Sequence, residues 1–387
     1  MRILTALTYY RPHISGLTIY TERLAKALAR RGHDVTVLTS QFDPSTPREE
    51  VKDNVLIVRA PIVMRVSKGV IMPTIGLLAS RLVLQNEVVH LHLPQFDAAG
   101  IALRGRLLAK PTVLTYHCDL KLPPGLFNRT ANYAVNMVDH LAALSAHRIV
   151  TYTDDYARHS PYARRYYHKV HTILPPVELP SVPKQAVDCF AKEHNLDGRS
   201  PVIGMAARFA AEKGVEVLLG ALRPVMEAHP NAVVLYAGQY QDVLGEDEYA
   251  ARLFPVIKAY QEKGQWKFLG VLDPSLMAAF YPNLDVLVVP SLNSTESFGL
   301  VQIEAMMNGV PVIASDLPGV RQPVVITGMG RTFPVGDSAA LAQALGDVLA
   351  NPREIKGDPE LISRQFSPDA TAAAYEALYT QIKGEIS

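Results

Sequence analysis

Two glutamates, Glu296 and Glu304, flank a Ser-Phe-Gly junction in the segment STESFGLVQIEAMMNGVPVIASD. The first follows DVLVVPS, an apolar run typical of a strand, and the second lies in an apolar helical pattern. Backbone N–H groups at a helix start, expected here at Phe298, Gly299 and Leu300, bind anions such as a nucleotide diphosphate. We therefore expect Glu304 to hold a ribose diol and Glu296 to accept hydrogen bonds from a sugar on that diphosphate. The alternative is that Glu296 only caps the helix and Glu304 is a solvated surface residue.

Two cations stand in a second segment, ARFAAEKGVEVLLGAL, at Arg208 and Lys213. Cleavage of a sugar–phosphate bond leaves negative charge on the departing diphosphate, so fixed cations are needed where that charge grows. Arginine can clamp two phosphate oxygens, and lysine acts as a compact point charge. Because these groups suffice and no Asp-x-Asp stands at a strand end, we expect no metal and no cofactor. The alternative is a pair of ordinary surface residues.

Histidines lie in two of the expected strands. His117 ends the run TVLTYH, which places it at the ligand edge of a parallel sheet, where its imidazole can reach a donor sugar or satisfy a structural role. His90 and His92 alternate along VVHLHLP and so point to one face. Since no Cys, Asp or Glu stands at ligand spacing from them, we interpret both as structural rather than metal-binding.

Length and composition favour two α/β domains. The chain has 387 residues, 48% hydrophobic and 19% charged, with two distant cysteines, which gives no disulfide framework and fits a reducing cytoplasm. No apolar run reaches the roughly 18 residues needed to cross a bilayer. We therefore expect a cytoplasmic protein.

Short β-branched runs alternate with helical patterns on either side of a proline-rich stretch, LPPVELPSVPK, at 174–184. This predicts two Rossmann-like, doubly wound domains facing a central cleft, at residues 1–178 and 185–366, with ligands at the carboxyl ends of the strands. A final helix at 367–387, with Tyr375 and Tyr379 on its apolar stripe, is expected to pack back on the first domain. The expected strands are 2–7, 34–40, 88–93, 112–117, 148–153, 201–207, 231–238, 265–271, 285–291 and 310–315.

Together these motifs resemble family 4 of the retaining glycosyltransferases, which have the GT-B fold. The glutamates match that family's E-x7-E motif, and Arg208 and Lys213 match its G-R-x-x-x-x-K-G motif. YRPHISGLTIYTERLAKALARRGHDVTVLT resembles its N-terminal glycine loop, and SDLPGV with GRTFPVGDSAALAQAL resembles its C-terminal signature. TYHCD carries His117 where the family places a histidine that contacts the donor sugar.

Four departures from the family pattern affect individual contacts. Ala207 stands where Gly commonly precedes the arginine, and Ser15-Gly16 replaces a frequent Gly-Gly, which leaves Gly16 as the phosphate-loop residue. Gln322 replaces a frequent glutamate, and the linker LPPVE lacks a common glycine.

The resemblance implies transfer of a hexosyl group from a UDP- or GDP-hexose, with retention, to a glycan or glycolipid hydroxyl. The catalytic residues would be His117, Glu296, Arg208 and Lys213, and the acceptor would bind the N-terminal domain. A nucleotide-sugar epimerase or a phosphorylase on the same architecture remains the alternative, as does a non-catalytic sugar-binding relative. The lack of G-x-G-x-x-G after the first strands argues against a dinucleotide oxidoreductase.

Charge is divided unevenly along the chain. Residues 1–180 hold 22 Lys and Arg against 13 Asp and Glu, a net +9, whereas residues 181–387 hold 16 against 24, a net −8. This suggests an anionic partner, and we expect no nucleic acid but a peripheral position at the inner face of the cell membrane, close to a lipid-linked acceptor. The basic residues that carry this expectation are interleaved with apolar ones: Arg65, Lys68, Arg158, Arg164, Arg165 and Lys169.

Overall fold

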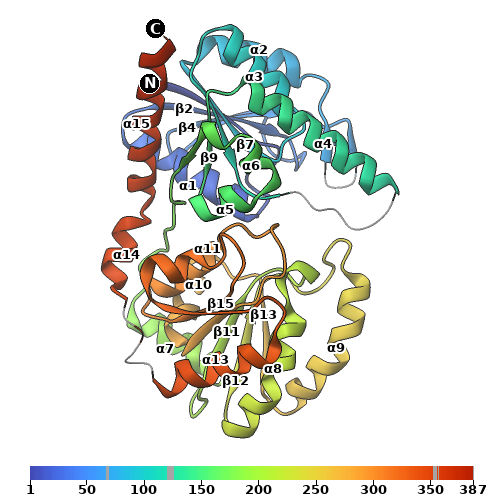
Figure 1. The fold of residues 1–387 in the computed structure, drawn as a ribbon, viewed down its shortest axis with the longest axis vertical. Coiled ribbons are helices and arrows are strands. Elements are labelled where there is room, and N and C mark those ends of the chain that lie inside the picture. Colours follow the sequence, from blue (N-terminus) through green and yellow to red (C-terminus); the bar gives the residue numbers. More distant parts are fainter. Residues whose placement is uncertain (67–68, 120–125, 352–354, 356, 387) are drawn as a thin grey trace. The chain divides into compact units, whose positions relative to one another are not determined.

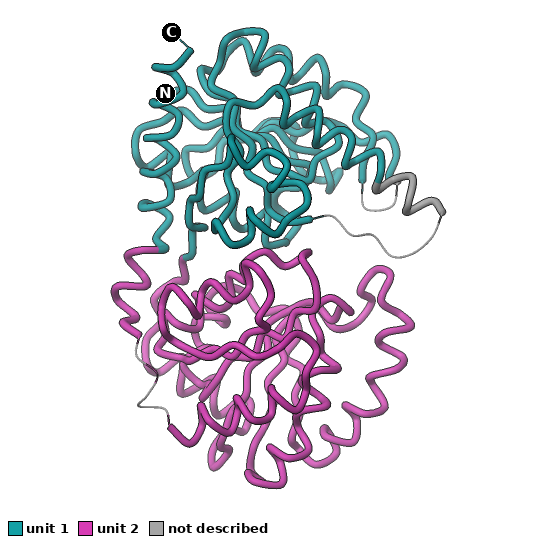
Figure 2. Tube along the Cα trace, viewed as in Figure 1, with its two compact units in different colours: residues 1–177, 366–387 teal, residues 178–365 magenta. Residues whose placement is uncertain are grey.

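The chain folds into two compact units in a computed structural model that describes residues 1–66, 69–119, 126–351, 355 and 357–386. Unit 1 comprises residues 1–177 together with 366–387, and unit 2 comprises residues 178–365 (Figures 1 and 2). The chain therefore leaves unit 1 within the proline-rich stretch and returns to it for the last helix. At the two crossing points, the N–H of Val177 donates to the carbonyl of Phe366 at 2.7 Å.

The large sheet of unit 1 has the strand order β10-β9-β8-β7-β1-β2-β4-β3, parallel except where β3 pairs with β4. A separate hairpin joins β5 to β6. The strands are β1 (Arg2–Ala6), β2 (Asp34–Ser40), β3 (Glu49–Lys52), β4 (Val55–Ala60), β5 (Met64–Val66), β6 (Gly69–Ile71), β7 (Val88–Leu93), β8 (Thr112–Tyr116), β9 (Arg148–Thr151) and β10 (Val170–Thr172).

Helices cover both faces of this sheet, and alternation along β7 shows how they divide. Val89, Leu91 and Leu93 pack in the core with α2, α3 and α4, whereas His90 and His92 meet side chains of α1 and α15. The α-helices of unit 1 are α1 (Gly16–Arg30), α2 (Ile75–Gln85), α3 (Ala98–Leu107), α4 (Leu126–Ser145), α5 (Asp154–His159), α6 (Pro161–Arg165) and α15 (Pro368–Ile386).

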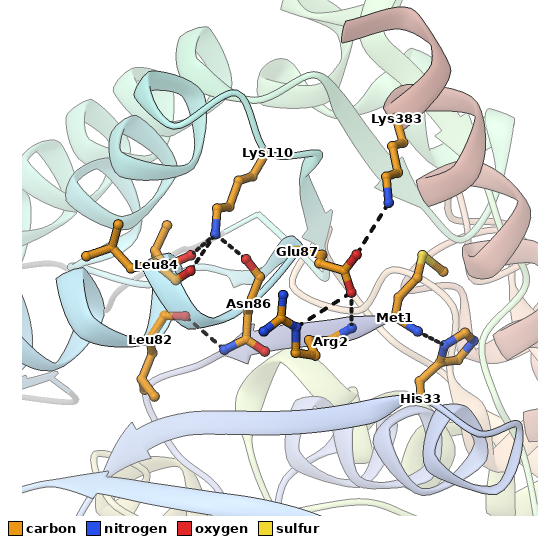
Figure 3. Close-up of polar contacts among 10 residues, drawn as sticks. Met1, Arg2, His33, Leu82, Leu84, Asn86, Glu87, Lys110 and Lys383 are labelled. Carbon is orange, nitrogen blue, oxygen red and sulfur yellow. Dashed lines mark hydrogen bonds and ion pairs between the residues drawn. The ribbon is translucent and has the colours of Figure 1, made fainter. Parts of the chain in front are cut away.

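Helix α15 packs beside α1 on unit 1 (Figure 1). The predicted stripe is buried, and its tyrosines bond into the sheet: Tyr379 meets Nδ1 of His90 at 2.7 Å and Tyr375 meets Thr115 at 2.6 Å. At the amino ends of β1 and β7, Lys383 pairs with Glu87, which also accepts a hydrogen bond from the backbone N–H of Arg2 (Figure 3). The last helix thus completes one face of unit 1.

Unit 2 contains a parallel sheet with the order β13-β12-β11-β14-β15-β16. Counted from β11, this is the doubly wound order 3-2-1-4-5-6, whose direction reverses between β11 and β14. Its elements are α7 (Lys184–Glu193), β11 (Val202–Ala206), α8 (Val215–Ala228), β12 (Val233–Ala237), α9 (Asp247–Glu262), β13 (Trp266–Gly270), α10 (Pro274–Phe280), β14 (Val286–Val289), α11 (Leu300–Met306), β15 (Val312–Ser315), α12 (Gln322–Thr327), β16 (Gly330–Phe333), α13 (Ser338–Ala350) and α14 (Pro359–Gln365).

We predict that Tyr379→Phe lowers the free energy of unfolding by about 1–3 kcal/mol, because it leaves the buried Nδ1 of His90 without a partner. The measurement is urea unfolding followed by far-UV circular dichroism. Thr380→Ala, on the exposed side of the same helix, is the control and should stay within about 0.5 kcal/mol of the wild type. Equal midpoints for both variants would contradict the role assigned to this hydrogen bond.

Candidate functional site

The two predicted motifs of unit 2 follow neighbouring strands at the point where the sheet reverses direction. Strands β11 and β14 pair in parallel, so their carboxyl ends lie at the same edge. Arg208 and Lys213 follow β11, and Glu296 follows β14. A cavity at this edge is lined by the ends of both strands and by residues of both loops, among them Lys213, Ser291 and Glu296. Ligands of doubly wound sheets bind at such a reversal point.

Backbone contacts join the two loops. The N–H of Leu292 donates to the carbonyl of Glu212 at 2.9 Å. Gly214 has a φ of +68°, and a Cβ at this position would lie 2.1 Å from the carbonyl oxygen of Pro290. Only glycine allows both this conformation and this approach. The glycine that follows Lys213 in the motif is therefore explained by how closely the two loops pack.

The charged side chains of these loops form two ion pairs. Lys213 Nζ lies 2.6 Å from Glu296 Oε2, with the two side chains only 19% and 22% exposed. Arg208 pairs with Glu212 at 2.5 Å but is 47% exposed. The first pair joins the two motifs, while the second lies at the surface, where such pairs contribute little to stability.

Glu304 lies in α11 and is buried, at 8% exposure, as its apolar neighbours in the sequence indicate. Its Oε2 accepts a hydrogen bond from the hydroxyl of Tyr281 at 2.8 Å. This tyrosine lies just after α10, 23 residues earlier in the chain, and no local pattern identifies it as a partner. The burial rules out the solvated-residue reading of Glu304.

The prediction that the helix starts at Phe298 was wrong. Helix α11 begins at Leu300. Gly299 has a φ of +80°, a left-handed conformation that cannot belong to a right-handed helix, so the helix cannot include Phe298. Phe298 is buried in the preceding loop, and a Cβ on Gly299 would lie 2.8 Å from the side chain of Gln302. Glycine is thus required at 299 by the local backbone conformation and by the packing of Gln302, without any reference to a ligand.

His117 lies in unit 1, directly after β8, and is buried with both ring nitrogens engaged. Its Nε2 meets Nδ1 of His92 at 2.9 Å, and its Nδ1 bonds the hydroxyl of Tyr152. The ring of Tyr20, from α1, stands edge-on to the imidazole with centroids 4.9 Å apart. His92 keeps one buried nitrogen, Nε2, without a hydrogen-bond partner among the described residues.

Gly16 is the first residue of α1, after Ser15, whose side chain accepts from the N–H of Thr18 as a helix cap. No atom lies within 4 Å of a Cβ built on Gly16, so packing within the described residues does not require glycine there. The candidates therefore fall into two groups. Gly16 and His117 belong to unit 1, while Arg208, Lys213, Glu296, Phe298, Gly299, Leu300 and Glu304 belong to unit 2.

Burial sets the charge state of the unit 1 histidines. It lowers the pKa of His90 and of His117 to about 3 and holds the pKa of His92 well below its ordinary value. All three imidazoles are therefore neutral at physiological pH. Hydrogen bonds of His90 to Tyr379 and Thr115 agree with the structural role predicted for it.

Within the described ranges, no three His, Cys, Asp or Glu side chains gather as a metal site would require. Neither Cys118 nor Cys189 forms a disulfide. No helix in the described parts of the chain combines the length and the apolar character needed to cross a bilayer.

Family comparisons agree with the motifs. Residues 14–179 match the model described as Glycosyltransferase Family 4, and residues 188–361 match the one described as Glycosyl transferases group 1. The chain is a family 4 glycosyltransferase. It is 27% identical to the 2-deoxystreptamine N-acetyl-D-glucosaminyltransferase of Streptomyces fradiae, over 94% of this chain and 90% of that one. It is also 37% identical to the phosphatidyl-myo-inositol mannosyltransferase of Mycobacterium leprae over a shorter stretch of 139 residues. This stretch covers 36% of this chain and 34% of that one.

Solved structures show the fold of this glycosyltransferase. Sucrose-phosphate synthase from Thermosynechococcus elongatus superposes with a TM-score of 0.76 at 22% identity, over 99% of both chains. Anabaena HepE in complex with UDP-glucose gives a TM-score of 0.74 at 17% identity, over 98% of this chain and 100% of that one. The fold is GT-B, as predicted from the sequence.

We predict that this glycosyltransferase loses stability as the pH falls below about 6.5, the ordinary histidine pKa. The unfolded chain then binds protons that the folded state, with a pKa of about 3 at His90 and His117, cannot bind. Each such histidine lowers the free energy of unfolding by up to about 1.4 kcal/mol per pH unit until the pH nears the folded pKa. Urea unfolding between neutral and mildly acidic pH measures this slope.

The test variant is His92→Gln, which removes one of the three buried imidazoles. It should make the slope of unfolding free energy against pH shallower, whatever its effect on stability at neutral pH. The exposed His171→Gln should leave the slope unchanged. A wild-type stability that rises on acidification over this range would contradict the neutral, buried cluster.

Proposed function

We propose that this glycosyltransferase moves a hexosyl group from a nucleotide-diphosphate sugar, a UDP- or GDP-hexose, to a hydroxyl of a glycan or glycolipid with retention of configuration. The observation that carries the proposal is the Lys213–Glu296 pair, which brings a cation and a carboxylate from the two motifs to the reversal point of the unit 2 sheet. The UDP-glucose bound to HepE, a protein of the same fold, supports a donor of this class.

In this proposal, unit 2 binds the donor. Arg208 and Lys213 would hold the diphosphate, together with backbone N–H groups of Phe298, Gly299 and Leu300, and Glu304 would accept from the ribose. An ammonium has three N–H donors, so Lys213 can keep one on Glu296 and present the others to phosphate oxygens. Glu296 would then orient the hydroxyls of the transferred sugar. Gly16, on unit 1, would allow a phosphate to approach the start of α1.

The chemical step needs stabilisation of the leaving diphosphate, which the two cations would supply as its charge develops. We propose a front-face course, in which a donor phosphate oxygen helps to deprotonate the acceptor hydroxyl. His117 would act as a hydrogen-bond partner of the donor sugar and not as an acid, because burial keeps its imidazole neutral. To make that bond it must release Tyr152 or His92, which hold its two nitrogens.

Unit 1 would bind the acceptor, and its excess of basic residues favours a position at the inner, cytoplasmic face of the cell membrane. A nucleotide-sugar epimerase or a phosphorylase on the same architecture is the alternative. An epimerase would convert the donor without any acceptor, and a phosphorylase would depend on inorganic phosphate. Product analysis with donor alone, donor with acceptor, and donor with phosphate separates the three.

We predict different losses for the two glutamates. Glu304→Ala should weaken binding of the donor and of the free nucleoside diphosphate alike, because the ribose is common to both. Glu296→Ala should spare nucleoside diphosphate binding yet lower turnover at least about tenfold, since only the transferred sugar loses a partner. Calorimetry with the diphosphate and steady-state kinetics with the full donor measure the two effects.

Tyr281→Phe is the matched control for Glu304, because it removes one hydrogen bond to the carboxylate and keeps its charge. It should bind the diphosphate more nearly like the wild type than Glu304→Ala does. Loss of diphosphate binding in Glu296→Ala, with binding retained in Glu304→Ala, would invert the assignment.

We also predict that Arg208→Ala and Lys213→Ala each reduce kcat by about a hundredfold or more, while EDTA leaves the wild-type rate nearly unchanged. Fixed cations rather than a bound metal would stabilise the leaving group. Arg223→Ala, which removes an exposed arginine from α8, is the control and should retain full activity. A rate abolished by EDTA and restored by manganese would refute the metal-independent mechanism.

A further inference from the structure

Helix α4 exposes an apolar stripe on unit 1. Tyr133, Met137, Leu141 and Leu144 are 73%, 48%, 49% and 63% exposed, and their spacing of four, four and three residues places them on one face. The opposite face carries Ala142 and Ala143, which pack in the core. A surface helix normally shows polar side chains on its outer face, whereas the exposed side chains of α4 from residue 133 onward, the part whose side chains the structure describes, are apolar.

The neighbouring helices continue this stripe. Helix α3 packs against α4 and exposes Leu103 and Leu107, and α2 packs against α3 and exposes Leu77 and Leu84 (Figure 1). In both helices the exposed leucines stand one or two turns apart, opposite the buried residues. We call the exposed apolar side chains of α2, α3 and α4 the apolar ridge. Extended apolar surfaces of this kind mark interaction sites.

Helices α2, α3 and α4 contain almost no acidic residues. Asp139 is the only Asp or Glu in the sequences of α2, α3 and α4, and it is 2% exposed. Burial also raises the pKa of Asp139 to about 7, so that the carboxyl is only partly ionised at neutral pH. By contrast α9, an exposed helix of unit 2, contains Asp247, Glu248 and Glu262. The ridge therefore presents no exposed carboxylate within the described residues.

Cations lie among the leucines. Arg104 bridges α3 to Ser80 of α2, and Arg106 is exposed at the end of α3; neither has a carboxylate partner in the described part of the chain. Arg81 of α2 pairs with Glu49 of β3. Lys110 is committed to backbone carbonyls at the end of α2, such as Leu84 at 2.9 Å (Figure 3). Among the described side chains of α2, α3 and α4, the cations available to a partner are thus the arginines of α3.

We propose that the apolar ridge is the surface by which this glycosyltransferase rests on an anionic lipid bilayer. The inference rests on the proposed function, in that it brings unit 1 to a lipid-linked acceptor. Leucines would enter the boundary between headgroups and acyl chains, with Arg104 and Arg106 at anionic headgroups, as in amphipathic helices that lie on membranes. A second copy of the chain, packed ridge to ridge, would bring these arginines together with no carboxylate to pair them.

The ridge differs from the basic residues that the sequence suggested. Arg65 packs over the ring of Phe42 and bonds its carbonyl, and Arg158 pairs with Asp154. Lys169 donates to carbonyls at the end of α4, such as Ala143 at 2.9 Å. Arg164 and Arg165 are exposed on α6, and Lys68 lies outside the described residues. Three of these cations are therefore already bound within unit 1.

The test is co-sedimentation of the full chain with vesicles of phosphatidylcholine alone or mixed with phosphatidylglycerol, at low and high salt. We expect binding to the mixed vesicles that weakens with salt. Leu141→Glu should reduce that binding about tenfold or more, because it places a charge where the bilayer would otherwise bury an apolar side chain. Val256→Glu, on α9 of unit 2, is the matched control, since Val256 is 48% exposed and Leu141 49%. Circular dichroism verifies that both variants fold.

Wild-type chain that stays in the supernatant with mixed vesicles at low salt would overturn the proposal. So would equal binding of Leu141→Glu and Val256→Glu, or a dimer in solution that Leu141→Glu dissociates. Donor binding, measured by calorimetry without vesicles, reports on the proposed function alone. Intact donor binding without vesicle binding rejects the ridge only, and vesicle binding without donor binding rejects the transferase proposal.

Discussion

The candidate site depends on how closely two loops of unit 2 approach each other. Gly214 lies against the carbonyl of Pro290 with no space for a Cβ, and Leu292 donates to Glu212 across the same junction. Because these contacts are between backbones, they fix the loops without using a functional side chain. The Lys213–Glu296 pair can then form at 2.6 Å from residues 83 positions apart in the chain.

In unit 1, the main constraint is the burial of polar histidine rings on one face of the sheet. His90, His92 and His117 are buried on one face, where they meet tyrosines of α1 and α15 and Tyr152, which directly follows β9. Most of these nitrogens have a partner, as buried polar groups require, and their low pKa values follow from the same burial. The neutral state of His117 therefore comes from the packing of a whole face and not from one neighbour.

Much of this organisation could be predicted from the sequence. The ten expected strands all exist, because each is a short run rich in apolar residues, and the tyrosine stripe of the last helix is buried as expected. Six of the described strands were not identified: β3, β4, β5, β6, β10 and β16. The segment REEVKDNVLIVRA, which holds β3 and β4, mixes charged and apolar residues at an edge of the sheet. The other four have only three or four residues each. The start of α11 was misplaced because the conformation of Gly299 depends on its surroundings. Tyr281 and Tyr152 could not be predicted as partners, because they reach Glu304 and His117 only through the fold.

The order of the chain has a consequence for synthesis on the ribosome. Unit 2 is inserted between the sheet of unit 1 and α15, so all of unit 2 is translated before the helix that completes unit 1. Until Tyr375 and Tyr379 emerge, the face of the nascent sheet around His90 lacks its cover and its hydrogen-bond partners. Unit 2 has no such dependence and can fold first, although its sequence starts later. The native packing of unit 1 therefore cannot be complete until α15 has been translated.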